Sequence, residues 1–210
     1  APGVKPAKVV VIGAGNVGYN AAWIAAGMQA EVVILDKNLD RLRYIEQICI
    51  GRTTTLASNR GAIERSLVDA DLVIGAVLIA GAKAPIVVSE DMVKTMKPGS
   101  VIVDVAVDQG GCIETTHETT HTDPVYTKHG VVHYAVGNMP GAVPNTSTYA
   151  LTNATLPYQI EIARYGARDA AIRNNAIRLG VNTVGGAITS EAVASELQAK
   201  YVDALVALQG

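Results

Sequence analysis

Short runs of apolar, mostly β-branched residues recur along the first two thirds of the chain. Five clear runs cover residues 8–13, 31–36, 71–77, 100–107 and 130–136, and a weaker one covers 53–57. Stretches with the length and polarity of helices lie between the earlier runs, at 16–29, 38–49, 59–70 and 89–96. Strands that are apolar on both faces and alternate with helices indicate a parallel sheet covered by helices on both sides.

The pattern changes after Pro144, where longer helical periods replace the alternation of strands and helices. We expect helices over about 146–165, 167–178 and 189–208. One face of the last helix would carry an apolar stripe made of Val193, Leu197, Tyr201, Leu205 and Leu208. The sequence therefore predicts an α/β protein: a doubly wound parallel sheet of Rossmann type over residues 1–144, then a C-terminal helical segment over 145–210.

Composition limits the classes of partner. The chain has 210 residues, 49% of them hydrophobic, which is enough to bury the core of one large domain, with or without a small appendage. Seventeen basic and nineteen acidic residues give a net charge of −2, so no broad positive field attracts nucleic acid or an anionic membrane. The longest uncharged run, residues 9–30, contains glycines and amides, and fits a strand followed by a helix better than a membrane span.

Cys49 and Cys112 lie far apart and have no metal-ligand spacing, so we expect free, inert thiols in a reducing compartment, the cytoplasm. The sequence begins with Ala1 rather than Met, which we interpret as a sign that an upstream segment was removed or not included.

Gly13, Gly15 and Gly18 form a Gly-x-Gly-x-x-Gly pattern directly after the first apolar run. The first glycine permits a tight turn, the second lets a pyrophosphate approach the backbone, and the third lets helix and strand pack closely. Asp36 ends the next strand, eighteen residues after Gly18, where a carboxylate accepts hydrogen bonds from the adenosine ribose. Together these features predict a dinucleotide site, whereas the glycines alone would be weak evidence.

Asp36 also favours NAD over NADP, because its charge would repel a 2′-phosphate. Lys37, Arg41 and Arg43 lie nearby and leave the opposite choice open, since cations could accommodate that phosphate. The same three residues are equally explained as the solvated start of a helix.

Asp104 and Asp108 mark the end of the fourth clear run, just before the flexible sequence Gln-Gly-Gly. Ligands of open parallel sheets bind at the carboxyl ends of the strands, so this region is a candidate site. The alternative for Asp108 is a structural one, in which its carboxylate caps nearby backbone amides.

Residues 117–121 read His-Glu-Thr-Thr-His, the pattern that zinc proteases carry on one face of a helix. The surrounding sequence is rich in threonine, follows Gly110 and Gly111 and precedes Pro124, all of which disfavour a stable helix. We therefore expect a polar loop and no metal site, with adventitious surface metal binding as the alternative. We expect His133, inside a strand pattern, to be a packed core histidine.

Three long stretches carry a resemblance to a known family: "ADLVIGAVLIAGAKAP", "MVKTMKPGSVIVDVAVDQGGCIET" and "VVHYAVGNMPGAVPNTSTYALTNATLPY". Together with the glycine-rich start they resemble alanine dehydrogenase over most of the chain, most specifically up to about residue 158. The NAD-binding subunit of proton-translocating transhydrogenase is a more distant relative.

The resemblance implies NAD-linked oxidative deamination of L-alanine to pyruvate and ammonium, and the reverse amination. It implies that Asp36 and Arg41 lie near the adenosine ribose, and that Ser58, Val77 and Leu78 line the path of adenine and ribose. Asp108 would be the acidic residue of the active site, beside the nicotinamide. The remaining cofactor contacts would come from the glycine loop and from the nicotinamide side: Gly13, Gly15, Asn16, Val17, Gly18, Asn138 and Met139.

The sequence also departs from the family pattern. Asn16 replaces a small apolar residue of the glycine loop, and the family's substrate-binding lysine and acid–base histidine belong to a region upstream of this sequence. Residues 145–210 would return to the substrate domain. We expect a homo-oligomer, and a non-catalytic NAD-binding module or a transhydrogenase-like NAD(H)-binding subunit stays open as the alternative.

Overall fold

A computed structural model describes residues 2–49, 53–79 and 81–209. The chain divides into two compact units, one of residues 1–79 and 83–139 and the other of residues 80–82 and 140–210. The boundary between two independent domains at residue 144 stays a prediction.

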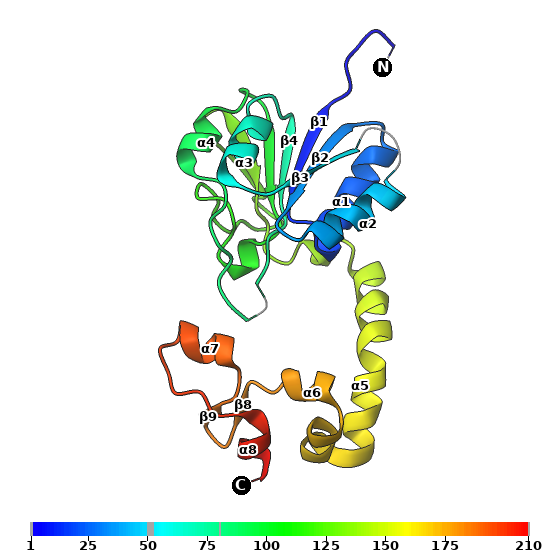
Figure 1. Cartoon of the computed structure of the whole chain (residues 1–210), viewed down its shortest axis with the longest axis vertical. Helices are drawn as coiled ribbons and strands as arrows, with labels where there is room; N and C mark the ends of the chain where they lie inside the picture. Colours follow the sequence, from blue (N-terminus) through cyan, green and yellow to red (C-terminus); the bar gives the residue numbers. More distant parts are fainter. Residues whose placement is uncertain (1, 50–52, 80, 210) are drawn as a thin grey trace. The chain divides into compact units, whose positions relative to one another are not determined.

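The first unit is built on a seven-stranded sheet with the order β3-β2-β1-β4-β5-β7-β6 (Figure 1). Its strands are β1 (Lys8–Ile12), β2 (Glu31–Asp36), β3 (Thr53–Ala57), β4 (Leu72–Gly75), β5 (Val101–Asp104), β6 (Val125–Lys128) and β7 (Val131–Tyr134). Neighbouring strands are parallel except for β6, which pairs antiparallel with β7. The predicted Rossmann-type sheet, including the weak run at β3, is confirmed.

The antiparallel edge strand β6 was not predicted from the sequence. Its four residues, Val125–Lys128, alternate between exposed and half-buried, so they give no continuous apolar run of the kind that identified the inner strands. The turn after it, His129 and Gly130, has positive φ at both residues, as tight hairpins require.

Four helices cover the sheet: α1 (Asn16–Gly27), α2 (Leu39–Ile48), α3 (Arg60–Leu67) and α4 (Glu90–Lys94). Figure 1 shows α1 and α2 on one face and α3 and α4 on the other. Side chains cap three of them at the N-terminus, because Asn38, Asn59 and Ser89 accept hydrogen bonds from the first-turn amides of α2, α3 and α4.

Successive side chains of β1 point to opposite faces of the sheet, so they pack into two separate core clusters. Val9 and Val11 join the apolar cluster under α1 and α2, whereas Val10 and Ile12 join the cluster under α3 and α4. All four are at most 4% exposed, and burying each contributes about 1.5–3 kcal/mol. A strand buried on both faces reads as a continuous apolar run, which explains the sequence pattern.

The turn from β1 to α1 depends on two close backbone contacts. Gly13 has φ of +103°, and a Cβ there would lie 2.5 Å from the Ala76 carbonyl oxygen. A Cβ on Gly18 would lie 1.7 Å from the carbonyl oxygen of Gly13. Only glycine at both positions lets α1 leave β1 at this angle.

His133 is fully buried in β7, as expected for a core histidine. Its Nδ1 lies 2.9 Å from the Val131 carbonyl oxygen and must carry the proton, so Nε2 accepts from the Thr115 hydroxyl at 2.8 Å. Tyr126 stacks on its ring, with His117 stacked on Tyr126 in turn. Burial lowers the pKa of His133, because the charged ring would lose its hydration.

The second unit begins with α5 (Pro144–Arg173) and continues with α6 (Asn175–Leu179), the hairpin β8 (Thr183–Val184) and β9 (Ala187–Ile188), α7 (Glu191–Glu196) and α8 (Ala204–Gln209). Gly166 has non-helical angles inside α5, where the sequence predicts a break between two helices. Within the described residues, no helix is long and apolar enough to cross a membrane.

The predicted helix over 189–208 is wrong, because the chain leaves the helix at Gln198, which has φ of +51°. Tyr201 then forms a bridge with Ile188 of β9, and the side chain of Asp203 caps the new helix α8. The expected stripe therefore does not form on one helix face: Leu197 is 64% exposed and Leu208 is buried. The predicted helix over 167–178 is likewise interrupted, at Asn174, whose side chain caps α6.

We predict that Gly18→Ala lowers the free energy of unfolding by about 1–3 kcal/mol, because the new methyl group would collide with backbone rather than with a side chain that can move. Gly27→Ala, at the other end of the same helix, is the matched control, since nothing lies within 4 Å of a Cβ there. Its stability should be unchanged or raised by up to about 1 kcal/mol. Urea unfolding measures both, and equal stability of the two variants would contradict the close contact at Gly18.

We also predict that the free energy of unfolding decreases as the pH is lowered, because of His133. The unfolded chain takes up a proton near pH 6.5, whereas the buried ring resists it, so unfolding is favoured as pH falls below about 6.5. His133→Gln should lose less free energy of unfolding between pH 7.5 and 5.5 than the wild-type chain does. Identical pH dependence of the two proteins would show that His133 does not titrate differently on folding.

Candidate functional site

Apart from Arg41 in α2, the predicted site residues lie at or just after the carboxyl ends of parallel strands in the first unit. The glycine turn follows β1, Asp36 ends β2, Ser58 follows β3, and Val77 with Leu78 follows β4. Asp108 follows β5 in the short 3₁₀ helix η1 (Val107–Gln109), and Asn138 and Met139 follow β7. Because these ends meet at one edge of the sheet, the sequence-predicted residues belong to the edge where such folds bind ligands.

The N-terminus of α1 is open toward this edge. Gly15 is its N-cap and supplies no side-chain hydrogen bond, unlike the capped ends of α2, α3 and α4. A Cβ at Gly15 would meet only the Arg41 guanidinium, at 3.8 Å, so there is room above the backbone. Asn16 and Val17 are exposed at the start of the helix. Free first-turn amides and the helix dipole favour an anion such as a phosphate here.

Asp36 connects the glycine turn with β2. One carboxylate oxygen accepts from the Ala14 amide at 2.6 Å and the other from the Asn38 amide at 2.7 Å. Each oxygen keeps a further lone pair, so the carboxylate can still accept from ribose hydroxyls. The Ser58 amide donates to the Asp36 carbonyl oxygen at 2.9 Å, which brings the end of β3 to the same point.

The Arg41 guanidinium lies 3.9 Å from the Asp36 carboxylate and is more than half exposed. It lines a pocket of about 360 Å³ beside the glycine turn, together with Ala14, Gly15, Asn16, Tyr19, Asp40 and Tyr44. Arg43 instead pairs with Asp40 across one helical turn, at 2.7 Å. Of the two arginines that could accommodate a 2′-phosphate, Arg41 is therefore the one that lies beside Asp36.

Val77 and Leu78 occupy different surroundings after β4. Val77 is half-buried and packs on the core cluster, whereas Leu78 is 59% exposed. Ala76, just before them, is the residue whose carbonyl approaches Gly13. An exposed apolar side chain beside the glycine turn suits contact with a flat, largely apolar ring.

Asp104 and Asp108 have different roles in the structure. Asp104 is fully buried, and its carboxylate accepts hydrogen bonds from the amides of Ala106, Cys112 and Ile113 and from the Thr116 hydroxyl, at 2.6–3.2 Å. It therefore holds together the loop that carries Asp108. Asp108 is exposed, and one of its oxygens accepts from the Asn138 amide at 3.1 Å.

These contacts bear on whether Asp108 has only a structural role, in which its carboxylate caps nearby backbone amides. Asp104 accepts hydrogen bonds from three backbone amides of the loop, a role that the sequence did not assign. Asp108 caps a single amide from another loop, and its exposed second oxygen has no protein donor in the part of the chain that the structure describes. It is thus the carboxylate of the pair that can meet a substrate.

Both cysteines are free and buried. Burial, together with the nearby charge of Asp104, raises the pKa of the Cys112 thiol to about 12. The thiol therefore stays protonated at neutral pH and is a poor nucleophile.

Residues 117–121 form no helix, as expected. Thr119 instead pairs with Val136, and His117 and His121 contact different partners, Tyr126 and Asn138. Among the described residues, no group of three or more His, Cys, Asp or Glu side chains is arranged to hold a metal ion.

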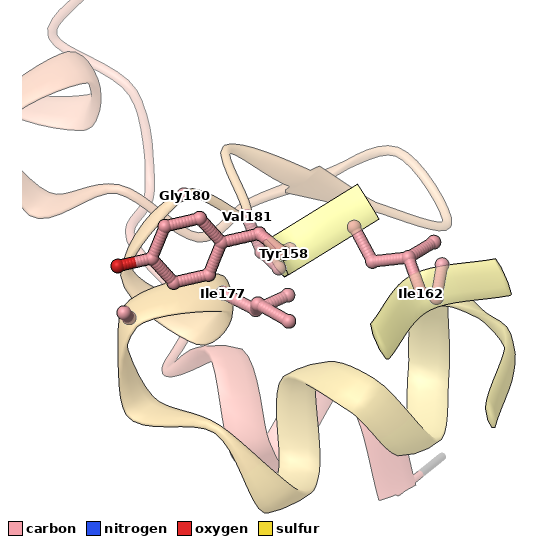
Figure 2. Close-up of a pocket in the computed structure, with 7 residues that line it drawn as sticks. Tyr158, Ile162, Ile177, Gly180 and Val181 are labelled. Carbon is pink, nitrogen blue, oxygen red and sulfur yellow. The ribbon is translucent and has the colours of Figure 1, made fainter. Parts of the chain in front are cut away.

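The second unit has an apolar pocket of about 550 Å³ (Figure 2). Its lining comes from α5, α6 and the residues after α6: Tyr158, Ile162, Ala167, Ala176, Ile177, Gly180 and Val181. All of these described lining residues are uncharged. The pocket therefore lacks the groups that acid–base or phosphate chemistry requires.

A dinucleotide fits the residues of the sheet edge in three respects. The turn at Gly13 and Gly18 is closed to any side chain, the space above Gly15 is open, and Asp36 is held by the turn itself. Sequence reasoning missed Tyr19 and Tyr44, which line the pocket with ring centroids 5.7 Å apart. They belong to two different helices, α1 and α2, so their spacing along the chain gave no signal of a shared pocket.

Comparisons with known proteins identify the family of the chain. A family model described as "Alanine dehydrogenase/PNT, C-terminal domain" matches residues 1–191. Alanine dehydrogenase of Bacillus subtilis (strain 168) is 58% identical over 99% of this chain, which corresponds to 55% of that protein. The chain thus spans about half the length of the curated relatives it matches.

Among solved structures, an L-alanine dehydrogenase matches with a TM-score of 0.83 and 49% identity over 94% of this chain and 55% of its own. A transhydrogenase from Sinorhizobium meliloti is less similar, with a TM-score of 0.61 and 27% identity over 70% of this chain and 42% of its own. The transhydrogenase-like alternative is therefore not favoured. Because the family model covers most of the sequence, the chain belongs to the family described as alanine dehydrogenase/PNT, C-terminal domain.

Proposed function

We propose that this chain is the nucleotide-binding half of an NAD-dependent alanine dehydrogenase. The whole protein would convert L-alanine, NAD and water to pyruvate, ammonium and NADH. Membership of the family implies NAD as the cofactor. The observation that carries the proposal for this chain is the contact between the Asp36 carboxylate and the Ala14 amide, because it joins a ribose acceptor to an open phosphate-binding turn.

In this proposal the amides at the start of α1 bind the pyrophosphate, with Gly13, Gly15, Asn16, Val17 and Gly18 forming the turn. Asp36 and Arg41 bind the adenosine ribose. Ser58, Val77 and Leu78 line the path of adenine and ribose, and Asn138 and Met139 contact the nicotinamide side.

Asp108 is proposed to act at the reacting carbon. A bound nicotinamide would supply the hydride acceptor for C2 of alanine, and Asp108 would orient the ammonia or water that reacts at that carbon. Its exposure and its fixed position against the Asn138 amide support this role. A carboxylate beside the developing positive charge of an iminium would also stabilise it.

The substrate's carboxylate needs a cation and its nitrogen needs an acid–base group. The resemblance assigns these tasks to a lysine and a histidine upstream of this sequence. We propose that the C-terminal segment, residues 145–210, belongs to that substrate domain in the whole protein.

We further propose a cytoplasmic homo-oligomer. Two buried, free thiols suit a reducing compartment. The outer face of α1 supports self-association, because Trp23, Ile24 and Met28 are each more than half exposed and the helix carries no charged residue. Sedimentation equilibrium measures the resulting assembly.

We predict that the chain binds NAD more tightly than NADP, and that Asp36→Asn weakens NAD binding by roughly ten- to a hundredfold. Hydrogen bonds to a charged acceptor are worth about 1.5–3 kcal/mol, and the lost charge also removes the repulsion of a 2′-phosphate. Asp91→Asn makes the same chemical change at an exposed position of α4 and should leave both affinities unchanged. Titration calorimetry tests this, and equal affinity of the wild-type chain for both cofactors would contradict the role of Asp36.

The second prediction is that the 210-residue chain binds NADH but does not oxidise alanine at a useful rate. General acid–base catalysis contributes about 10²- to 10⁴-fold to the rate, and substrate positioning contributes further. The resemblance assigns both tasks to a lysine and a histidine outside the proposed nucleotide-binding half. NADH absorbance, followed with millimolar alanine, measures turnover, and calorimetry measures binding. Failure to bind NADH would refute the proposed function, whereas turnover of about one per second would show that the catalytic groups lie in this sequence.

A further inference from the structure

The segment His117–His121 lies against the loop that carries the proposed nicotinamide contacts. Thr119 is the link: its amide donates to the Ala135 carbonyl oxygen at 2.9 Å, and its carbonyl oxygen accepts from the Gly137 amide at 3.1 Å. Glu118 packs so closely on Gly137 that a Cβ there would lie 2.0 Å from its carboxylate oxygen. The segment therefore runs beside residues 135–138 and pairs with them at one isolated parallel bridge, Thr119 with Val136.

The two histidines of this segment face different neighbours. His117 stacks on Tyr126, with ring centroids 4.0 Å apart. His121 reaches the end of the loop, where its Nε2 lies 3.1 Å from the carbonyl oxygen of Asn138. A carbonyl oxygen only accepts, so Nε2 carries the proton in this contact, whether or not the ring takes up a second proton.

Asn138 is thereby held from both sides. Asp108 accepts from its amide at 3.1 Å, and His121 donates to its carbonyl oxygen at the same distance. The backbone of Asn138 is left-handed, with φ of +51°, which residues other than glycine adopt less readily. Contacts on both peptide groups stabilise this conformation and so fix the direction in which Asn138 and Met139 leave the sheet.

We propose that His121 is a positioning residue for the nicotinamide-binding loop, residues 137–139. It acts through the backbone of Asn138, opposite Asp108, and touches neither cofactor nor substrate. The His-Glu-x-x-His sequence thus contributes, through His121, one of the two hydrogen bonds that hold the backbone of Asn138. We call this pair of contacts, from His121 and Asp108, the clamp. This inference rests on the proposed function, because that function assigns Asn138 and Met139 to the nicotinamide side.

Two ligands can test the role of His121, because they differ only in the nicotinamide, the part that the loop would position. NADH carries the nicotinamide, whereas ADP-ribose has the same adenosine, pyrophosphate and second ribose without it. His121→Ala should weaken NADH binding by about three- to tenfold, as expected for the loss of one hydrogen bond, and leave ADP-ribose binding unchanged. His121→Gln should restore most of the NADH affinity, because its amide can donate from a position close to that of Nε2.

His117→Ala is the matched control, since it removes the other histidine of the segment without removing a contact to Asn138. Calorimetry with both ligands, on all four proteins, gives the affinities. Hydrogen exchange of the Asn138 amide gives a readout independent of any ligand, and exchange should be faster in His121→Ala but not in His117→Ala.

The measurements distinguish failure of the positioning role from failure of the proposed function. If the wild-type chain binds both ligands and His121→Ala binds NADH normally, or loses both ligands equally, the positioning role is overturned while the proposed function stands. Unchanged exchange of the Asn138 amide in His121→Ala would overturn the clamp itself. A wild-type chain that binds neither NADH nor ADP-ribose would refute the proposed function and the role of His121 with it.

Discussion

The approach of two backbone segments at Gly13 and Gly18 is the contact on which the functional edge depends. Gly13 abuts the Ala76 carbonyl beyond β4, and Gly18 abuts the carbonyl of Gly13 itself. With no Cβ at either position, α1 begins directly above the end of β1 and keeps its first amides free of side-chain caps. Asp36 then reaches across from β2 to the Ala14 amide, so one turn connects three strands of the parallel sheet.

The opposite half of the edge is organised by a buried carboxyl group. Backbone amides and a hydroxyl donate hydrogen bonds to Asp104, which makes its burial tolerable. The loop that it gathers exposes Asp108 beside Asn138. Two aspartates four residues apart thus have different roles because only one of them reaches solvent.

Much of this could be read from the sequence. Continuous apolar runs predicted the inner strands, since both faces of those strands are buried, and the glycine spacing predicted the turn after β1. The edge strand β6 and the break at Gln198 were missed, because half-exposed strands and left-handed non-glycine residues leave no periodic signal. The roles of Asp104 and His121 depend on contacts between separate loops, which spacing along the chain does not encode. The ligand contacts of the site residues stay predictions.

In the proposed binding mode, one edge of the sheet binds the two halves of NAD at two separate groups of residues. Amide chemical shifts in two-dimensional NMR would locate both groups. NADH should shift the amides of Ala14, Gly15 and Asn16 together with that of Asn138, whereas ADP-ribose should shift the first three and leave Asn138 unchanged. Shifts from NADH that avoid the glycine turn, or that cluster in the second unit around Tyr158, would rule out this binding mode.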